Sequence, residues 1–463
     1  MRHITTYQDK KVLVLGLGES GVNVAKLLHQ LGAQVTVNDL KQFAADDPDI
    51  VALRKLGIEV ITGHHPTALL DDGFQYLVKD PGIRYDNPMI VKAAANHIPV
   101  ISEPEVAFEA SSAPWIGITG TNGKTTTTTM IELMLNDHRK CGHAYADGNI
   151  GVSASKVVQK ATADDVMVTE LSSFQLQGTT KLRPHIAVIT NIYSTHLDYH
   201  GDRAHYIAAK MKITANQTAD DYLVINWDKA EWRDLSKQTQ AQVIPFSAQD
   251  LNEDGAYLKN GTLYFKGEPI IKADAIKVPG EQNIENALAA IAVAKLMGQD
   301  NQAIVDVLTT FPGVKHRVQF VAEYQQRRFY NDSKATNITA TQVALRSFKQ
   351  PVILLAGGLD RGNGFDDLIP SLREHVKAIV LFGQTADKIA AAARKAGVKT
   401  IKFAERAGAA VPLAYQLSAP GDVILLSPAC ASWDQYSHFE VRGDEFIDAV
   451  HHLIAKQGGK PCE

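Results

Sequence analysis

The sequence predicts an α/β protein of three domains, on the strength of its length, its alternating pattern and its polar turns. The chain has 463 residues, whereas one domain usually takes about 100–200. Short apolar runs alternate with segments of helical period, as in folds where helices cover a parallel sheet. Polar turns follow several of these runs, where open α/β sheets bind their ligands. We expect domains over residues 1–112, 113–312 and 313–463.

The first domain is predicted to begin with a strand, a glycine turn, a helix and a second strand. Residues 11–15 form an apolar run, and residues 16–21 have the sequence Gly-Leu-Gly-Glu-Ser-Gly. A helical pattern then continues to Gly32, and the apolar residues 35–37 are followed by Asn and Asp39. Such a turn binds a diphosphate, and an acid at the end of the second strand accepts a ribose hydroxyl. The pattern predicts a Rossmann-like domain that binds NAD or another nucleotide diphosphate, because the turn recognises pyrophosphate rather than nicotinamide.

A second glycine turn, in the central third of the chain, predicts an ATP site. It follows an apolar strand at residues 115–118. Its residues are Gly120, Thr121, Asn122, Gly123, Lys124, Thr125 and Thr126. The N–H groups of such a loop surround phosphate oxygens, Lys124 neutralises the β- and γ-phosphates, and the Thr125 hydroxyl reaches Mg²⁺. The loop is a variant, because Ile118 stands where a glycine is usual, and no Asn-Lys-x-Asp element favours GTP. We therefore expect a central P-loop ATPase-like domain built on a parallel sheet.

Acidic and histidine side chains at later strand ends predict a metal site beside this loop. The apolar residues 166–168 lead to Glu170, and His196 and Asp198 follow another apolar run at residues 186–189. Taken singly, each side chain is more often a surface or capping group. Because ligand groups gather at the carboxyl ends of parallel strands, we expect these side chains to lie near the phosphates.

Two polar loops in the last third predict a further ligand site, in a C-terminal Rossmann-like domain. Residues 331–337 follow a strand-like run at 327–330, and residues 427–435 follow an apolar strand at 423–426. The simpler alternative is turn chemistry and helix capping. Cys430 is expected to be a small buried residue rather than a nucleophile, because no histidine or other activating neighbour is evident.

The composition excludes several classes of protein. Lys and Arg number 47 against 51 Asp and Glu, and this net charge of −4 without a basic block argues against a nucleic-acid partner. The 3 widely spaced cysteines exclude a disulfide framework and a paired-cysteine metal site. No stretch is apolar enough for a membrane span and no secretion signal is evident, so we expect a cytoplasmic protein.

Together these motifs resemble those of the Mur ligase family of ATP-dependent amide-forming enzymes. The matching segments are residues 119–126, 280–290, 316–317, 331–337, 427–436 and 439–443. The similarity extends in order from residue 16 to residue 446. The last of these segments resemble the branch of the family that adds D-glutamate to UDP-N-acetylmuramoyl-L-alanine in peptidoglycan synthesis.

The resemblance implies a reaction and its cofactors. ATP would phosphorylate the terminal carboxylate of the nucleotide sugar to an acyl phosphate, and the amine of D-glutamate would attack it to give an amide, ADP and phosphate. Two Mg²⁺ sites are implied, with Mn²⁺ as an alternative metal. Thr125 and Glu170 would hold the first ion, and His196 and a carbamate on Lys210 the second. The residues alone favour the simpler alternative that Lys210 is a solvated helix lysine.

The resemblance also assigns residues to each ligand. The implied catalytic residues are Lys124, His196, Lys210 and Arg317. Besides the loop, ATP would contact Asn283, Asn286, Arg317 and Asp332. The nucleotide sugar would contact Glu19, Ser20, Asp39, Lys41, Asn149 and His196. D-Glutamate would contact Lys334, Thr336, Ser432 and Phe439, with Arg361 near the position where the family has a lysine.

Residues 79–83 depart from the family pattern. Asp80 stands where serine is usual, and a carboxylate there would repel a diphosphate. We expect a monomer. The alternatives are a sibling ligase for another amino acid or a folylpolyglutamate-type ligase, either of which would share the central domain but not the two polar loops. A nicotinamide oxidoreductase would use the first turn and leave the ATP loop without a role.

Overall fold

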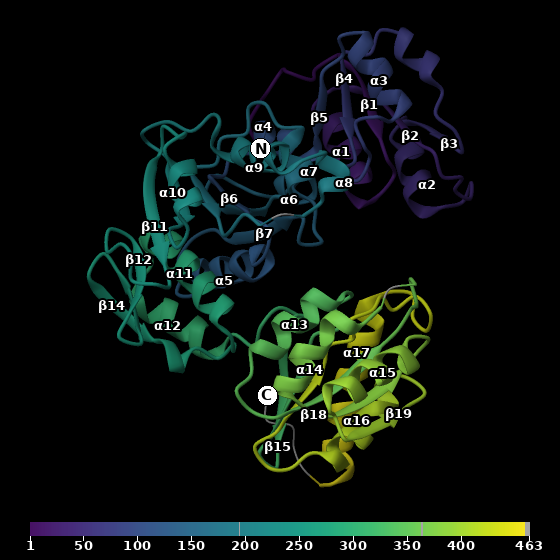
Figure 1. Cartoon of the computed structure of the whole chain (residues 1–463). Helices are drawn as coiled ribbons and strands as arrows, with labels where there is room; N and C mark the ends of the chain where they lie inside the picture. Colours follow the sequence, from purple (N-terminus) through teal and green to yellow (C-terminus); the bar gives the residue numbers. More distant parts are fainter. Residues whose placement is uncertain (194, 363, 459–463) are drawn as a thin grey trace. The chain divides into compact units, whose positions relative to one another are not determined.

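Three sheets organise the chain in the computed structural model, which describes residues 1–193, 195–362 and 364–458 (Figure 1). The first is a parallel sheet in the order β3-β2-β1-β4-β5. Its strands are β1 (Lys11–Leu15), β2 (Gln34–Asp39), β3 (Glu59–Thr62), β4 (Tyr76–Lys79) and β5 (Val100–Ser102). Its helices are α1 (Glu19–Gln30), α2 (Pro48–Lys55), α3 (Pro88–Ala95) and α4 (Glu103–Ala110). The chain reverses direction across the sheet between β1 and β4, so the crevice where such sheets bind ligands lies at the carboxyl ends of these two strands.

The predicted βαβ unit at the start of the chain is confirmed. Four of the five residues of β1 are buried, and α1 turns Val24, Leu27 and Leu28 into the core. The glycine turn is required by close packing, because a Cβ atom on Gly21 would lie 2.1 Å from the carbonyl oxygen of Gly16. The first helix therefore crosses directly over the end of the first strand.

The second sheet has nine strands in the order β14-β13-β12-β11-β10-β9-β6-β8-β7. The parallel part contains β6 (Trp115–Thr119), β7 (Ala144–Gly148), β8 (Val166–Glu170), β9 (Ile186–Ile189), β10 (Tyr222–Asn226) and β11 (Gln242–Ser247). An extension adds β12 (Ala256–Lys259), parallel to β11, and the antiparallel strands β13 (Thr262–Phe265) and β14 (Glu268–Lys272). The helices are α5 (Lys124–Asn136), α6 (Ala154–Val158), α7 (Ser173–Gln177), α8 (Leu197–His200), α9 (Arg203–Met211), α10 (Ala230–Ser236), α11 (Glu281–Leu296) and α12 (Asn301–Thr310). The predicted strands of this third of the chain are confirmed, whereas the sequence analysis did not foresee the extension β12–β14.

The third sheet has six strands in the order β15-β16-β20-β17-β18-β19. The strands are β15 (Gln319–Tyr324), β16 (Arg327–Asn331), β17 (Val352–Gly357), β18 (Val376–Phe382), β19 (Thr400–Phe403) and β20 (Val423–Leu426). All pairs are parallel except β15 with β16. The helices are α13 (Ile338–Arg346), α14 (Ile369–His375), α15 (Ala386–Ala396), α16 (Ala407–Leu417) and α17 (Phe439–Lys456). The two predicted polar loops begin at the carboxyl ends of β16 and β20, which are neighbours in the sheet.

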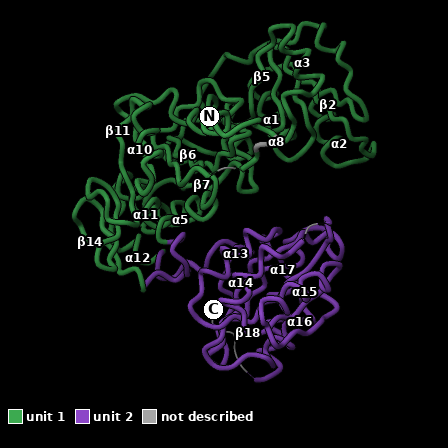
Figure 2. The backbone as a smooth tube through the Cα atoms, viewed as in Figure 1, with its two compact units in different colours: residues 1–274, 284–307 green, residues 275–283, 308–463 purple. Residues whose placement is uncertain are grey.

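The three sheets fall into two compact units (Figure 2). Unit 1 comprises residues 1–274 and 284–307 and contains the first two sheets, whereas unit 2 comprises residues 275–283 and 308–463 and contains the third. The first two sheets share one hydrophobic core, which includes Val37 from β2, Ala107 from α4 and Leu176 from α7. This shared core explains why they form one unit.

The stretch that leads from β5 to the second sheet, residues 103–114, is largely a buried helix, α4. Oε1 of Glu105 accepts hydrogen bonds from the N–H groups of Thr180 and Lys181 at 3.0 and 2.6 Å, and Oε2 accepts one from the N–H of Leu182 at 3.1 Å. A buried carboxylate of this helix therefore holds a loop that precedes β9 of the second sheet.

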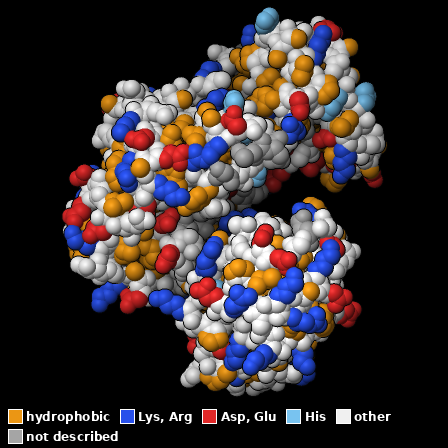
Figure 3. Space-filling model, viewed as in Figure 1, with side chains coloured by type: hydrophobic (Ala, Val, Ile, Leu, Met, Phe, Trp, Pro, Cys, Tyr) orange, Lys and Arg blue, Asp and Glu red, His pale blue; other side chains and the backbone are white. Residues whose placement is uncertain are grey.

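The surface carries both signs of charge, in agreement with the nearly equal numbers of basic and acidic residues in the sequence. On the face drawn in Figure 3, basic and acidic side chains are interspersed over both units. Among the described residues, no helix combines the length and the apolar character that a bilayer crossing requires.

Candidate active site

The ATP loop connects β6 to α5 in the backbone conformation that phosphate binding requires. Gly120 and Gly123 have φ angles of +151° and +82°. A Cβ atom on Gly120 would lie 1.9 Å from Oγ1 of Thr190, and one on Gly123 would lie 2.2 Å from Oδ1 of Asn286. Gly123 is the N-cap of α5 and no side chain caps this helix end. The first N–H groups of α5 therefore have no side-chain cap that would compete with a phosphate.

Two lysine ammonium groups meet at this loop. Nζ of Lys124 donates to the carbonyl oxygens of Gly120 and Thr121, at 3.1 Å in both cases. Nζ of Lys210, from α9, donates to the same carbonyl oxygen of Gly120 at 2.7 Å. The structure thus brings together two predicted residues that are 86 positions apart in the chain.

Lys210 is buried, in contrast to the solvated lysine that the residues alone favoured. Its residue exposure is 1%. Burial holds the pKa of Lys210 well below its usual range, the nearby charge of Lys124 lowers it further, and Glu170 opposes the shift. The side chain therefore has a strong tendency to be an uncharged amine in this surrounding.

Glu170 is the acid at the end of β8, as predicted, and it is also buried. Its Oε1 accepts a hydrogen bond from the side-chain amide of Asn149 at 2.7 Å. Its Oε2 is buried and has no hydrogen-bond partner among the described residues. A buried carboxylate oxygen without a partner is suited to a hard cation such as Mg²⁺. Thr125, at the start of α5, is buried as well.

His196 precedes α8 and has a φ angle of +55°. Its side chain is exposed, and its ring lies edge-on to that of Phe174 with the centroids 5.1 Å apart. The side chain of Asp198 lies outside the described residues.

Tyr206 also lies at this loop, and no motif of the sequence predicted it. Its hydroxyl lies 2.9 Å from Oγ1 of Thr121, within hydrogen-bond distance, and its ring lies below Nζ of Lys210, 4.8 Å from the ring centroid. Tyr206 precedes Lys210 by one helical turn, so it lies on the same face of α9. This i, i+4 spacing is the one signal in the sequence that links the two residues.

The two asparagines of the second family segment both lie on α11. Asn286 belongs to unit 1 and contacts the ATP loop, since its Oδ1 accepts a hydrogen bond from Oγ1 of Thr127 at 3.3 Å. Asn283 belongs to unit 2, and its side-chain amide donates to the carbonyl oxygen of Pro279 at 2.6 Å.

Asp332 of unit 2 is held within the protein by both carboxylate oxygens. Oδ1 accepts a hydrogen bond from the N–H of Val318 at 3.2 Å, and Oδ2 accepts one from Oγ of Ser427 at 2.8 Å. Burial raises the pKa of Asp332 to about 7, and the nearby Arg317 opposes the shift. Nε of Arg317 is buried without a hydrogen-bond partner among the described residues. Arg317 and Asp332 therefore interact electrostatically, and the carboxylate of Asp332 already has hydrogen-bond partners within the protein.

The residues assigned to the amino acid occupy the two polar loops and their surroundings. Nζ of Lys334 lies 5.7 Å from the ring centroid of Phe439, which begins α17. The guanidinium of the exposed Arg361 stacks on the ring of Trp433, 5.0 Å from its centroid. Oγ of Ser432 is buried and has no hydrogen-bond partner among the described residues. Thr336 is half-buried.

Arg442 is a second residue to which the sequence analysis gave no role. It is fully buried, and it donates to the carbonyl oxygens of Ser333 at 2.8 Å and Cys430 at 3.1 Å. The guanidinium therefore connects the two polar loops. Cys430 is buried and its Sγ lies 3.2 Å from Oγ1 of Thr385, so it has the structural role that was predicted.

In the first domain, Asp39 holds the glycine turn. Its Oδ2 accepts a hydrogen bond from the N–H of Leu17 at 2.7 Å, and its Oδ1 accepts one from the N–H of Lys41 at 2.8 Å. Glu19 and Ser20 form the first turn of α1, and the exposed Lys41 places Nζ 5.1 Å from the ring centroid of Phe43. The predicted nucleotide residues therefore lie around one turn, at the carboxyl ends of β1 and β2.

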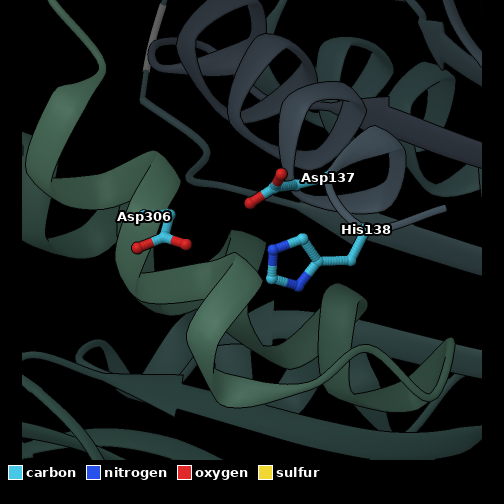
Figure 4. A group of neighbouring side chains, drawn as sticks. All are labelled: Asp137, His138 and Asp306. Atoms are coloured by element: carbon cyan, nitrogen blue, oxygen red, sulfur yellow. The ribbon is translucent and has the colours of Figure 1, made fainter.

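A separate group of possible metal ligands lies near the other end of α5 (Figure 4). The ligand atoms of Asp137, His138 and Asp306 lie within 4.8 Å of one another. Asp306 accepts a hydrogen bond from Nε2 of Gln302 at 2.8 Å, and Nδ1 of His138 lies 3.5 Å from a carboxylate oxygen of Asp300. The side chains of His138 and Asp306 therefore have partners within the protein, and we assign no metal to this group.

Comparison with known proteins identifies similar domains along the chain. Residues 10–102 match the family model described as Mur ligase MurD-like, N-terminal domain. Residues 118–294 match the Mur ligase middle domain, and residues 316–430 match the Mur ligase, glutamate ligase domain. The predicted fold of three α/β domains is confirmed by these matches together with the sheets described above.

Curated relatives are similar over the whole chain. A UDP-N-acetylmuramoylalanine--D-glutamate ligase from Latilactobacillus sakei is 62% identical over 453 residues, which cover 98% of this chain and 100% of the relative. A protein of the same name from Listeria innocua is 57% identical, with coverage of 98% and 99%.

Solved structures share the fold at lower identity. The UDP-N-acetylmuramate-alanine ligase MurC from Thermotoga maritima has a TM-score of 0.60 at 20% identity, covering 96% of this chain and 99% of that one. MurF from Acinetobacter baumannii has a TM-score of 0.58 at 17% identity, with coverage of 94% and 93%.

Proposed function

Because this chain belongs to the Mur ligase family, we propose that it uses ATP to join D-glutamate to UDP-N-acetylmuramoyl-L-alanine, a step of peptidoglycan precursor synthesis. The observation that carries the proposal is the 62% identity to a ligase of that name over the full length of both chains. The loop in unit 1 supports ATP as a substrate. The match of unit 2 to the glutamate ligase domain supports D-glutamate as another.

The ATP loop would bind and orient the triphosphate. The uncapped N–H groups of α5 and the ammonium group of Lys124 supply positive charge where the β- and γ-phosphates bind. Phosphoryl transfer to a carboxylate depends mainly on positioning and charge neutralisation, and the loop residues provide both. The substrate carboxylate attacks the γ-phosphorus, ADP leaves, and the acyl phosphate then loses phosphate when the D-glutamate amine attacks its carbonyl carbon.

We propose that Thr125 and Glu170 hold one Mg²⁺ and that His196 and Lys210 hold a second, with Mn²⁺ as an alternative. The unpartnered Oε2 of Glu170 supports the first assignment. When bound, these ions would neutralise the charge of the transferred phosphoryl group. Asn149 orients the carboxylate of Glu170 through its hydrogen bond to the other oxygen.

We also propose that Lys210 carries a carbamate. An uncharged amine is the form that adds to CO₂, and the addition releases one proton and leaves an anionic carboxylate. The burial and the lowered pKa of Lys210 favour the uncharged amine. The modification would turn a cation beside the ATP loop into an oxygen ligand for a metal.

D-Glutamate would bind to residues of unit 2. Its two carboxylates require cations and hydroxyl groups, and Arg361, Lys334, Thr336 and Ser432 offer them. Phe439 would line the same site. The unpartnered hydroxyl of Ser432 supports this assignment, because a buried hydroxyl without a partner is suited to a ligand oxygen.

We further propose a cytoplasmic monomer with domains over residues 1–112, 113–312 and 313–463. Sedimentation equilibrium of the purified chain tests the oligomeric state, and cell fractionation tests the location. Either a stable dimer or recovery in the membrane fraction contradicts the corresponding proposal.

The release of phosphate from ATP tests the reaction. The assay varies the nucleotide sugar and the amino acid independently, with L-glutamate, L-lysine and meso-diaminopimelate beside D-glutamate. We expect release that depends jointly on UDP-N-acetylmuramoyl-L-alanine and D-glutamate. Equal release with another amino acid would identify a sibling ligase, and release without any amino acid would rule out the ligase reaction.

A further inference from the structure

Lys79 is a buried cation that no predicted role explains. It is the last residue of β4, and 1% of it is exposed. Its Nζ donates to the carbonyl oxygens of Asp80 and Pro81, at 3.2 Å in both cases, and to the hydroxyl of Tyr199 at 3.3 Å. Within the described residues, no carboxylate oxygen lies close enough to Lys79 to form an ion pair. Burying such a charge without an ion-pair partner is costly, so a nearby anion would stabilise it.

The loop above Lys79 packs against the glycine turn. The N–H of Asp80 donates to the carbonyl oxygen of Leu15 at 2.8 Å. A Cβ atom on Gly16 would lie 2.7 Å from Cβ of Asp80, and one on Gly18 would lie 3.5 Å from its Oδ2. The loop that follows β4 and the turn that follows β1 therefore lie side by side, at the point where the strand order of the sheet reverses. This is the crevice beside the glycine turn for which the sequence predicts a diphosphate site.

The carboxylate of Asp80 faces both segments. Its Oδ1 accepts a hydrogen bond from the N–H of Gly82 at 2.9 Å, while its Oδ2 is directed toward Gly18. A negative charge at this position opposes the binding of a diphosphate, as the sequence analysis anticipated. Lys79 donates to the carbonyl group of the same Asp80, and the carboxylate of Asp80 opposes the lowering of the Lys79 pKa by burial, so the two opposite charges interact.

The loop is also connected to the second sheet through Tyr199. The hydroxyl of Tyr199 donates to the carbonyl oxygen of Ile83 at 3.2 Å and accepts the hydrogen bond from Lys79. Tyr199 lies on α8, the helix that begins directly after His196. The ring of Tyr199 is edge-on to that of Phe174, with the centroids 4.4 Å apart. Lys79 and Tyr199 thus hold residues 80–83 through hydrogen bonds to the carbonyl oxygens of Asp80, Pro81 and Ile83.

We propose that Lys79 is a positioning residue of the diphosphate site, which fixes the loop at residues 80–83 and balances the charge of Asp80. The inference rests on the proposed nucleotide-sugar substrate. The diphosphate of the ligand then adds further negative charge near the buried cation. Lys79 acts through the loop and through its charge, because its Nζ is covered by the oxygen atoms that it binds.

The binding of UDP to the full chain, measured by calorimetry, tests this inference without requiring turnover. We expect Lys79→Met to weaken UDP binding about tenfold, because it removes one positive charge from the site. Asp80→Asn should strengthen UDP binding several-fold, because it removes the opposing charge. Lys92→Met is the matched control, since Lys92 pairs with Asp71 at the surface of the same domain. This control should bind UDP as the wild type does.

The melting temperature and the kinetic constants of the variants distinguish a positioning role of Lys79 from a purely structural one. Replacing a buried charge that forms no ion pair by an apolar side chain of similar length should leave the melting temperature unchanged or raise it. The KM for the nucleotide sugar should rise in Lys79→Met, while kcat and the KM values for ATP and D-glutamate should stay within twofold of the wild type. If Lys79→Met does not fold, Lys79→Gln and Asp80→Asn decide the question.

Wild-type UDP affinity in Lys79→Met or Lys79→Gln, or an Asp80→Asn variant that binds UDP no more tightly, would overturn the inference. Failure of the proposed function is a different result. In that case the wild type would bind UDP with the same dependence on Lys79 and Asp80, but would not ligate D-glutamate.

Discussion

The side-chain amide of Asn149 donates to one carboxylate oxygen of Glu170 at 2.7 Å, and the other oxygen of this buried carboxylate has no partner among the described residues. Asn149 follows β7 and Glu170 ends β8, and these two strands are neighbours in the sheet. The sheet thus aligns a residue assigned to the nucleotide sugar with one assigned to the metal. The amide leaves Glu170 one oxygen with which to bind a cation.

Glu170→Gln should therefore reduce kcat by about a hundred- to a thousandfold, because an amide oxygen binds a divalent cation poorly. Phosphate release at saturating substrates and a titration with Mg²⁺ measure the loss. Glu268→Gln, at an exposed position on β14, is the control and should behave as the wild type does. Retention of more than a tenth of the activity in Glu170→Gln would remove Glu170 from the metal site.

Lys210→Ala should lose activity that short carboxylates partly restore. The substitution deletes the proposed carbamate, and acetate or formate can supply an anionic oxygen in the space left by the side chain. The assay compares phosphate release with and without each carboxylate, and Lys212→Ala is the control on the following turn. A loss of activity that no carboxylate restores, together with an intact lysine mass by mass spectrometry of the native wild type, would contradict the carbamate.

Asp332 should make the stability of the chain depend on pH. Its folded-state pKa of about 7 lies above the ordinary value of 3.8, so the folded state binds the proton more tightly. The stabilisation by this residue is complete below the ordinary pKa and is lost as the pH rises through the folded-state pKa. From about pH 5 to about pH 8 the wild type should lose up to about 3 kcal/mol relative to Asp332→Asn. Thermal denaturation of both proteins across this range measures the difference, and a difference independent of pH would show that Asp332 is ionised throughout.

Trp433→Ala should raise the KM for D-glutamate several-fold and leave the KM for ATP unchanged. Trp433 is 64% exposed, and its ring supports the guanidinium of Arg361. A stacked guanidinium loses less freedom when it binds a carboxylate, so removing the ring weakens the ligand. Phe403→Ala removes another exposed aromatic ring of unit 2 and serves as the control. An equal rise in both variants would mean that the stacking has no part in binding.

The sequence predicted those elements of the fold that depend on residues close to one another in the chain. The strand before Gly16 and the strand before Gly120 are short apolar runs, and each is followed by a glycine that close packing requires. The extension β12–β14 was not foreseen, because its short strands pair antiparallel at the sheet edge and mix buried with exposed positions.

The sequence assigned roles to residues that stand in motifs, but it did not predict the contacts between residues that are far apart in the chain. Nothing local distinguishes Lys210 from a surface lysine, because its burial arises from the packing of α9 against the ATP loop. Arg442 likewise contacts residues more than a hundred positions away, at Ser333. The Asp80 side chain lies beside Gly16 and Gly18, from which more than sixty positions separate it in the sequence.

The hydrophobic core shared by the first two sheets has a consequence for how the protein loses its structure. One continuous cluster includes Val37 of the first sheet and Leu176 of the second domain. The carboxylate of Glu105 accepts hydrogen bonds from residues 180 and 182 across the same junction. Two domains that share a core unfold cooperatively, because exposing the apolar surface of one exposes that of the other. A heat-capacity scan of this three-domain chain should therefore resolve two endotherms, with the domains of the first two sheets melting together in one of them.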